Sequence, residues 1–109
     1  MTDNLERGFH QAMLSRYESW KAYGYRANRF LMALRNRGGL GAAKYLLAKD
    51  GISPGLVRLA KEGATHLSVE ALVLSEPWDQ LFTDGEKAKA RRVLGEVRGK
   101  SEMRTLEQI

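Results

Sequence analysis

Glycines divide this chain into short segments, and within each segment the apolar residues recur at helical spacing. The breaks fall at Gly24, Gly38–Gly39, Gly51, Gly63 and Gly99. Glycine readily adopts the left-handed backbone that often follows a helix, so each of these positions is suited to end one. Because apolar residues between the breaks step by three and four, we expect an all-α domain: a compact bundle of six or seven mostly short helices.

The expected helices follow from this spacing. The first runs to the YGY sequence at 23–25, and later ones cover 26–36, 41–48, 55–62 and about 69–74, then a turn after Pro77 and a last helix from Thr83 to about Val97. The run at 69–74 could suit a strand, but its Leu and Ala residues and the absence of a second strand favour a helix. We expect residues 1–99 to form a single helical domain and residues 100–109 a frayed polar tail.

Three side chains are expected to begin helices. Ser53, which is followed by a proline, is typical of an N-cap, and Ser68 is a second candidate. Thr83 and Glu86 have the spacing of a capping box, in which each side chain bonds the other residue's backbone N–H. Glu70 and Glu86 are then explained as first-turn acids that favour the helix dipole, without a catalytic role.

Composition excludes several classes of protein. The 109 residues include no cysteine, so disulfides and thiolate metal sites are ruled out. Hydrophobic residues make up 43%, which is typical of one globular domain. The longest apolar runs, such as LVL at 72–74, are too short to span a membrane, and residues 1–10 have no apolar core for a secretory signal. We therefore expect a cytoplasmic protein with no membrane partner.

The positive charge is concentrated in one half of the chain. The net charge is +5, and residues 1–50 carry nine Lys and Arg against four Asp and Glu, whereas the rest of the chain is balanced. A surplus confined to one half favours a coherent positive face and an anionic partner, although an ordinary solvated surface explains the same charge. Inhibitors that mimic DNA need a negative surface, so that class is excluded.

The basic residues are interleaved with aromatic ones, a mixture that can contact phosphates and stack on bases. The candidate nucleic-acid contacts are Arg26, Arg29, Arg35, Arg37 and Lys44, with Arg58 and Lys61 as possible groove contacts. The alternative is that aromatic residues such as Trp20, Tyr25 and Phe30 are core anchors and the arginines only solvate the helices. For Arg35 and Arg37, beside a double glycine, both interpretations stay open.

No catalytic motif is present. His10 and His66 stand apart without the HExxH or HxxxH spacing of metal ligands, and GxSxG is missing. The glycine-rich stretch at 38–44 matches neither the phosphate loop GxxxxGK[ST] nor GxGxxG. We therefore expect a non-enzymatic protein without cofactor or metal. A pocket with convergent polar groups and strongly shifted carboxylates would favour an enzyme instead.

A helix-turn-helix is an alternative arrangement for the segments GAAKYLLA and SPGLVRLAKEG. Arg58 and Lys61 would then face the DNA groove. The connection between the two segments, however, is longer than the three or four residues of that motif, and the second helix has few side chains that read bases.

The chain resembles an uncharacterised small bacterial helical domain. The resemblance rests on GGLGAAKYLL and LSVEALVL, within a pattern that extends over about residues 9 to 95. Members of that family look like stand-alone proteins or modules joined to other domains, sometimes nucleases of the restriction type. The resemblance implies a shared fold and a DNA-related or defence context, but no catalytic residues.

These observations predict a nucleic-acid-associated accessory module whose basic face contacts the phosphates of DNA or RNA. The alternative is an interaction adaptor that docks a larger protein subunit through an exposed apolar patch. Trp78, Leu81 and Phe82, close to a proline turn, are the candidates for that patch.

Overall fold

The computed structural model describes residues 2–107, and these residues form helices and no strands. The elements are α1 (Thr2–Lys21), α2 (Asn28–Ala48), α3 (Pro54–Lys61), the 3₁₀ turn η1 (Thr65–Leu67), α4 (Val69–Val73), the 3₁₀ turn η2 (Trp78–Leu81) and α5 (Asp84–Glu107). The all-α class is confirmed. The expected number of helices is slightly off, because the described residues contain five α-helices.

Two predicted helices, 26–36 and 41–48, are joined in the single kinked helix α2. Gly38 lies at the kink with φ 73° and ψ 170°, a conformation that is essentially restricted to glycine. Gly39 continues the helix and sits directly on α1: a Cβ atom there would lie 2.6 Å from the Cα of His10. The backbone N–H of Gly39 donates to Nδ1 of His10 at 2.8 Å. The double glycine therefore turns α2 while holding it against α1.

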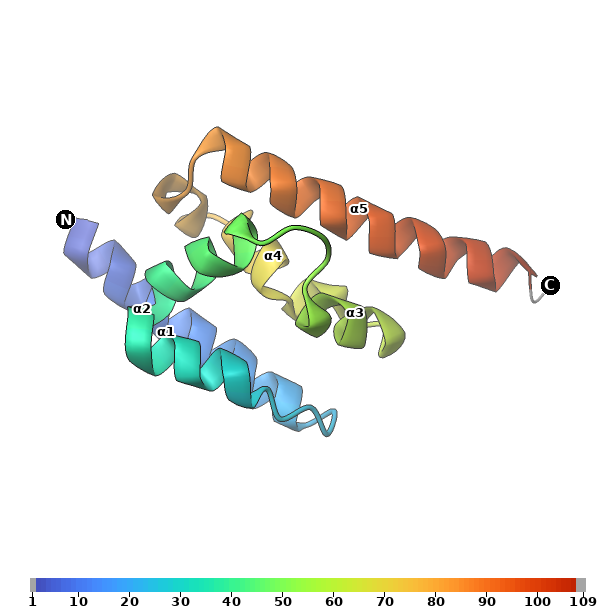
Figure 1. Ribbon diagram of the computed structural model, residues 1–109, viewed down its shortest axis with the longest axis horizontal. Helices are drawn as coiled ribbons and strands as arrows, with labels where there is room; N and C mark the ends of the chain where they lie inside the picture. Colours follow the sequence, from blue (N-terminus) through green and yellow to red (C-terminus); the bar gives the residue numbers. More distant parts are fainter. Residues whose placement is uncertain (1, 108–109) are drawn as a thin grey trace.

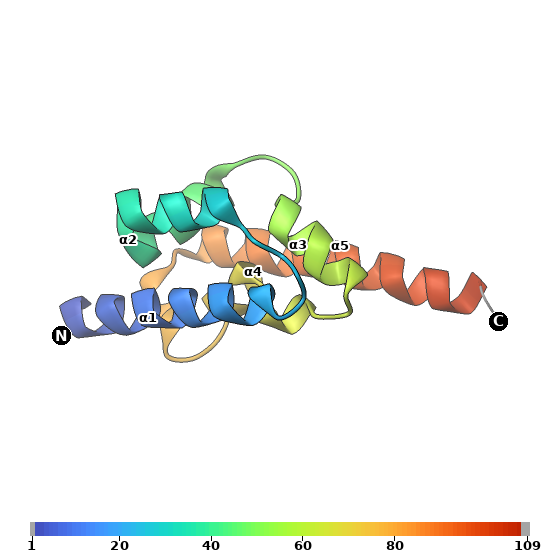
Figure 2. The ribbon, with the colours of Figure 1, turned by 90° about the horizontal axis from the view of Figure 1, so that it is seen from below.

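Helices α1 and α2 pack side by side through an aromatic cluster (Figures 1 and 2). Phe9, Met13 and Trp20 recur at helical spacing on α1 and are buried. The Trp20 ring centroid lies 4.7 Å from that of Phe30 on α2, and its Nε1 donates to the carbonyl oxygen of Leu67 at 2.8 Å. Trp20 thus ties α1 both to α2 and to the turn before α4.

The short helix α4 lies in the middle of the molecule and α5 crosses over it (Figure 1). The predicted helix at 69–74 is confirmed, with Val69 and Val73 buried and Ser68 as the cap. The capping box is also present: Thr83 N–H donates to Glu86 Oε1 at 2.8 Å, and Glu86 N–H donates to Thr83 Oγ1 at 3.1 Å.

Helix α5 runs past the point where it was expected to end. It continues through Gly99 to Glu107, so residues 100–107 of the expected tail are helical, and residues 108–109 lie outside the described residues. Gly99 keeps a negative φ, whereas the glycines that do stop or turn helices, among them Gly24 and Gly63, have a positive one. The end of α5 projects beyond α3 (Figure 2), and the molecule measures 50 × 30 × 23 Å.

Within residues 2–107, no helix is both long and apolar enough to cross a membrane.

Candidate functional site

A cavity of about 480 Å³ lies between the two ends of α2, the loop that follows it, α3 and the start of α4. Its walls are mainly apolar and come from Trp20, Phe30, Leu46, Ile52, Leu56, Leu59 and Val69. The kink in α2 is what makes this enclosure possible, because it folds the end of the helix back over the beginning. We call this space the α2–α3 pocket.

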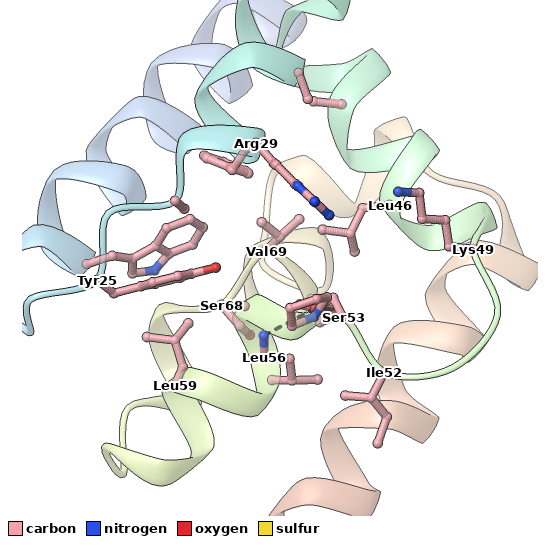
Figure 3. A pocket seen from close by; sticks show the side chains of 18 of the residues that line it. Tyr25, Arg29, Leu46, Lys49, Ile52, Ser53, Leu56, Leu59, Ser68 and Val69 are labelled. Atoms are coloured by element: carbon pink, nitrogen blue, oxygen red, sulfur yellow. Dashed lines mark hydrogen bonds between the residues drawn. The ribbon is translucent and has the colours of Figure 1, made fainter.

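Three exposed cations surround the α2–α3 pocket. Arg26 and Arg29 come from the start of α2 and the residues before it, and Lys49 follows its last residue. Figure 3 shows the side chains of Arg29 and Lys49 extending toward one another over the apolar walls. None of the three forms an ion pair with any acidic residue that the structure describes, although Asp50 also lines the pocket.

A buried carboxyl group lies in the wall of the same pocket. Glu70, in the first turn of α4, is only 2% exposed. Its Oε2 accepts a hydrogen bond from Ser53 Oγ at 2.9 Å. The same Ser53 Oγ caps α3 by accepting a hydrogen bond from the backbone N–H of Leu56. Burial raises the pKa of Glu70, although the Ser53 hydrogen bond and the charge on Lys89 oppose the shift. Burial therefore makes a negative charge on this wall of the pocket more costly than it would be in water.

Next to the pocket, an exposed tyrosine is flanked by two cations. The Tyr45 side chain, on the second half of α2, lies 3.9 Å from the Arg37 guanidinium and 4.5 Å from Lys49 Nζ, measured to the ring centroid. Tyr45 is 42% exposed and also lines the pocket. Arg26, Arg29, Tyr45 and Lys49 line the pocket, and Arg37 lies against the Tyr45 ring; we call these five residues the basic–aromatic cluster.

Lys44 is a predicted phosphate contact that the structure places elsewhere. Its Nζ lies 2.7 Å from Glu86 Oε1 and over the ring of Phe82, so its charge is used in packing α2 against α5. Burial acts to raise the pKa of Glu86, but hydrogen bonds from Lys44 and Thr83 outweigh it and hold the pKa below its ordinary value. Lys44 is therefore paired inside the fold.

Arg58 and Lys61 lie on α3, away from the cluster. Arg58 bonds Glu62 at 3.3 Å and the carbonyl oxygen of Tyr23 at 3.2 Å, and Lys61 is exposed. The two helices expected to form a helix-turn-helix do not pack on each other as that motif requires: α3 packs on α5 and η1, and the α2–α3 pocket separates it from α2.

A second hollow, of about 400 Å³, surrounds the double glycine. It is lined by residues 38–41 and by Glu6, Arg7, His10 and Arg37. Arg35 is exposed but lines neither hollow. Among the predicted contacts, the structure therefore brings together Arg26, Arg29 and Arg37, and leaves the others outside the cluster.

The predicted apolar patch is largely inside the fold. Phe82 is buried, with its ring centroid 5.3 Å from that of Phe9. Trp78 and Leu81 are half-buried and pack against the core, and the Trp78 ring lies against Gly8 of α1. These side chains attach η2 to α1 and present little apolar surface to a partner.

One feature that would favour an enzyme is present. The α2–α3 pocket holds a buried carboxyl group with a raised pKa, and Tyr25, Lys49 and the exposed Asp50 also line it. Among the described residues, no group of His, Asp and Glu is arranged to hold a metal ion.

Sequence reasoning overlooked Tyr45, Lys49 and the buried position of Glu70. Tyr45 and Lys49 are four residues apart, which places them on one helix face, and this signal was available. Glu70 stands among apolar residues in LSVEALVL, so a helix buried on most sides had to bury it too. That Arg29 and Lys49 line the same pocket depends on the kink in α2 and had no local signal.

Comparison with models of protein families, with curated proteins and with solved structures finds no match to this chain. The resemblance to an uncharacterised bacterial helical domain stays a prediction.

Proposed function

We propose that this protein is a non-enzymatic module that binds single-stranded nucleic acid through the basic–aromatic cluster. The observation that carries the proposal is the exposed ring of Tyr45 between Arg37 and Lys49. Binding of single strands without sequence preference combines cations that follow the phosphates with aromatic rings on which bases stack. Arg26 and Arg29 extend the positive charge along the same side of α2.

The lack of acidic partners for several of these cations favours nucleic-acid binding over the alternative that they only solvate the helices. Lys44 and Arg58 each have an acidic partner, whereas Arg29, Arg37 and Lys49 have none among the described residues. An unpaired cation releases counterions when it meets a phosphate, and this release drives binding. A paired one must first give up its partner.

The test is fluorescence anisotropy of labelled single-stranded DNA and RNA over a range of salt concentrations. Changing Arg29, Arg37 and Lys49 together to Ala should reduce the slope of log K against log salt by about 2, since each single-strand phosphate contact contributes about 0.7. Tyr45→Leu should weaken binding by about 1–3 kcal/mol without changing the slope, because it removes stacking and no charge. Absence of binding at low salt would overturn the proposal.

The adaptor alternative has less support. Its three proposed contact residues include the buried Phe82, and the two others are half-buried against the core.

A further inference from the structure

The α2–α3 pocket has the size and the lining of a small-molecule site. Its volume of about 480 Å³ lies within the range of about 300–1,000 Å³ that is usual for such pockets. Trp20, Leu56, Leu59 and Val69 lie at its walls and are themselves almost wholly buried, so they are fixed by the core. A hollow with rigid apolar walls is more stable when an apolar group replaces the water inside it.

The cations at its mouth suit an anionic group. Arg29 and Lys49 are twenty residues apart in sequence, and the kink at Gly38 brings them to face one another across the opening (Figure 3). Each of these exposed cations can donate charge-assisted hydrogen bonds to a carboxylate or a phosphate. Because no described acidic residue pairs with either, that position is open to a ligand.

The polar groups deeper in the pocket include no cation, so we expect the charged head of a ligand to lie at the mouth. Glu70 is buried and its Oε2 already accepts from Ser53 Oγ, so this wall offers an anionic head no positive charge. The arrangement has a direction: apolar surface inside and positive charge at the rim.

We propose that the α2–α3 pocket binds a small amphipathic anion, with a hydrocarbon body against Phe30, Leu46 and Leu59 and a carboxylate or phosphate head between Arg29 and Lys49. This proposal goes beyond nucleic-acid binding and does not rest on it: the two sites share Arg26, Arg29, Tyr45 and Lys49, but the apolar walls that would hold the hydrocarbon body have no part in nucleic-acid binding.

The experiment is isothermal titration calorimetry of the full chain with four probes: decanoate, decyl phosphate, decanol and adenosine monophosphate. We expect decanoate or decyl phosphate to bind, and the stronger of the two identifies the preferred head group. Decanol should bind more weakly by about tenfold or more, since it lacks the charge. Adenosine monophosphate, whose body is polar, should not compete with decanoate.

Variants separate the pocket from the surface. Arg29→Ala and Lys49→Ala should each weaken the binding of the alkyl anion by about tenfold, the effect of losing one charge-assisted contact. Arg37→Ala removes the same charge outside the pocket and should leave the affinity unchanged, although it is expected to weaken nucleic-acid binding. Leu46→Trp, which fills the cavity, should abolish binding in a variant whose thermal unfolding stays cooperative.

The proposal is overturned if neither alkyl anion binds, if decanol binds as tightly as decanoate, or if Arg29→Ala and Lys49→Ala have no more effect than Arg37→Ala. None of these measurements contains nucleic acid, so failure here is distinct from failure of the proposed function.

Discussion

At the scale of single residues, the fold decides which charges are available to a partner. Lys44 and Lys49 are five residues apart, one inside α2 and the other directly after it, and sequence alone gives no reason to treat them differently. Lys44 meets Glu86 of α5, whereas Lys49 lies beside Tyr45 at the rim of the pocket. The difference arises from long-range packing, because Glu86 comes from a helix that begins 40 residues later than Lys44.

Glu70 gives a prediction about stability and pH. Its pKa is raised by burial, so its contribution to stability is complete below about pH 4.5, the ordinary value, and is lost as the pH rises through the pKa of the folded state. Glu70→Gln removes this titration and keeps an oxygen for Ser53. We expect the free energy of unfolding of the variant, relative to the wild type, to increase from pH 4 to pH 8.

Urea denaturation at several pH values measures this difference. A difference that stays constant, or that falls as the pH rises, would contradict a buried Glu70 that favours its neutral form.

At the scale of elements, the kink in α2 determines the site. The sequence correctly predicted helical segments on both sides of Gly38 and an interruption between them. It could not predict that they form one helix bent around the start of α3, since the bend depends on the contact between Gly39 and His10 of α1. The elements were thus predictable and the enclosure of the pocket was not.

The kink can be tested with a pair of glycine substitutions. Gly38→Ala places a Cβ at φ 73°, and although space is available, the backbone strain should lower the free energy of unfolding by about 1–3 kcal/mol. Gly95→Ala is the matched control: it lies inside α5 with ordinary backbone angles and open space, and should raise stability by about 0.5–1 kcal/mol. Chemical denaturation measures both, and equal effects at the two positions would contradict the left-handed kink.

At the scale of the whole molecule, the local signals of the sequence were mostly sufficient for the fold class. The caps at Ser53 and Ser68 and the capping box at Thr83 form as expected, because they depend only on neighbouring residues. The end of α5 was mislocated, since Gly99 is tolerated inside a helix. The apolar patch around Phe82 was expected at the surface, because spacing alone does not reveal that α1 covers it.

The uneven charge of the two halves also has a structural outcome. The surplus of residues 1–50 is distributed over α1, α2 and the segments around them, and part of it gathers in the basic–aromatic cluster. Net charge therefore indicated the half of the chain that carries most of the cluster, but it could not separate paired from unpaired cations.

The central claim, that the unpaired cations of the basic–aromatic cluster contact nucleic acid, is tested most directly by comparing Lys44→Ala with Lys49→Ala. Each variant removes one positive charge from the same stretch of chain, and the measurement is the salt dependence of single-stranded DNA binding by fluorescence anisotropy. We predict that Lys49→Ala reduces the slope by about 0.7 and that Lys44→Ala leaves it unchanged, while Lys44→Ala lowers stability by up to about 1 kcal/mol. Equal reductions in slope for the two variants would contradict the account, because binding would then follow net charge and not the cluster.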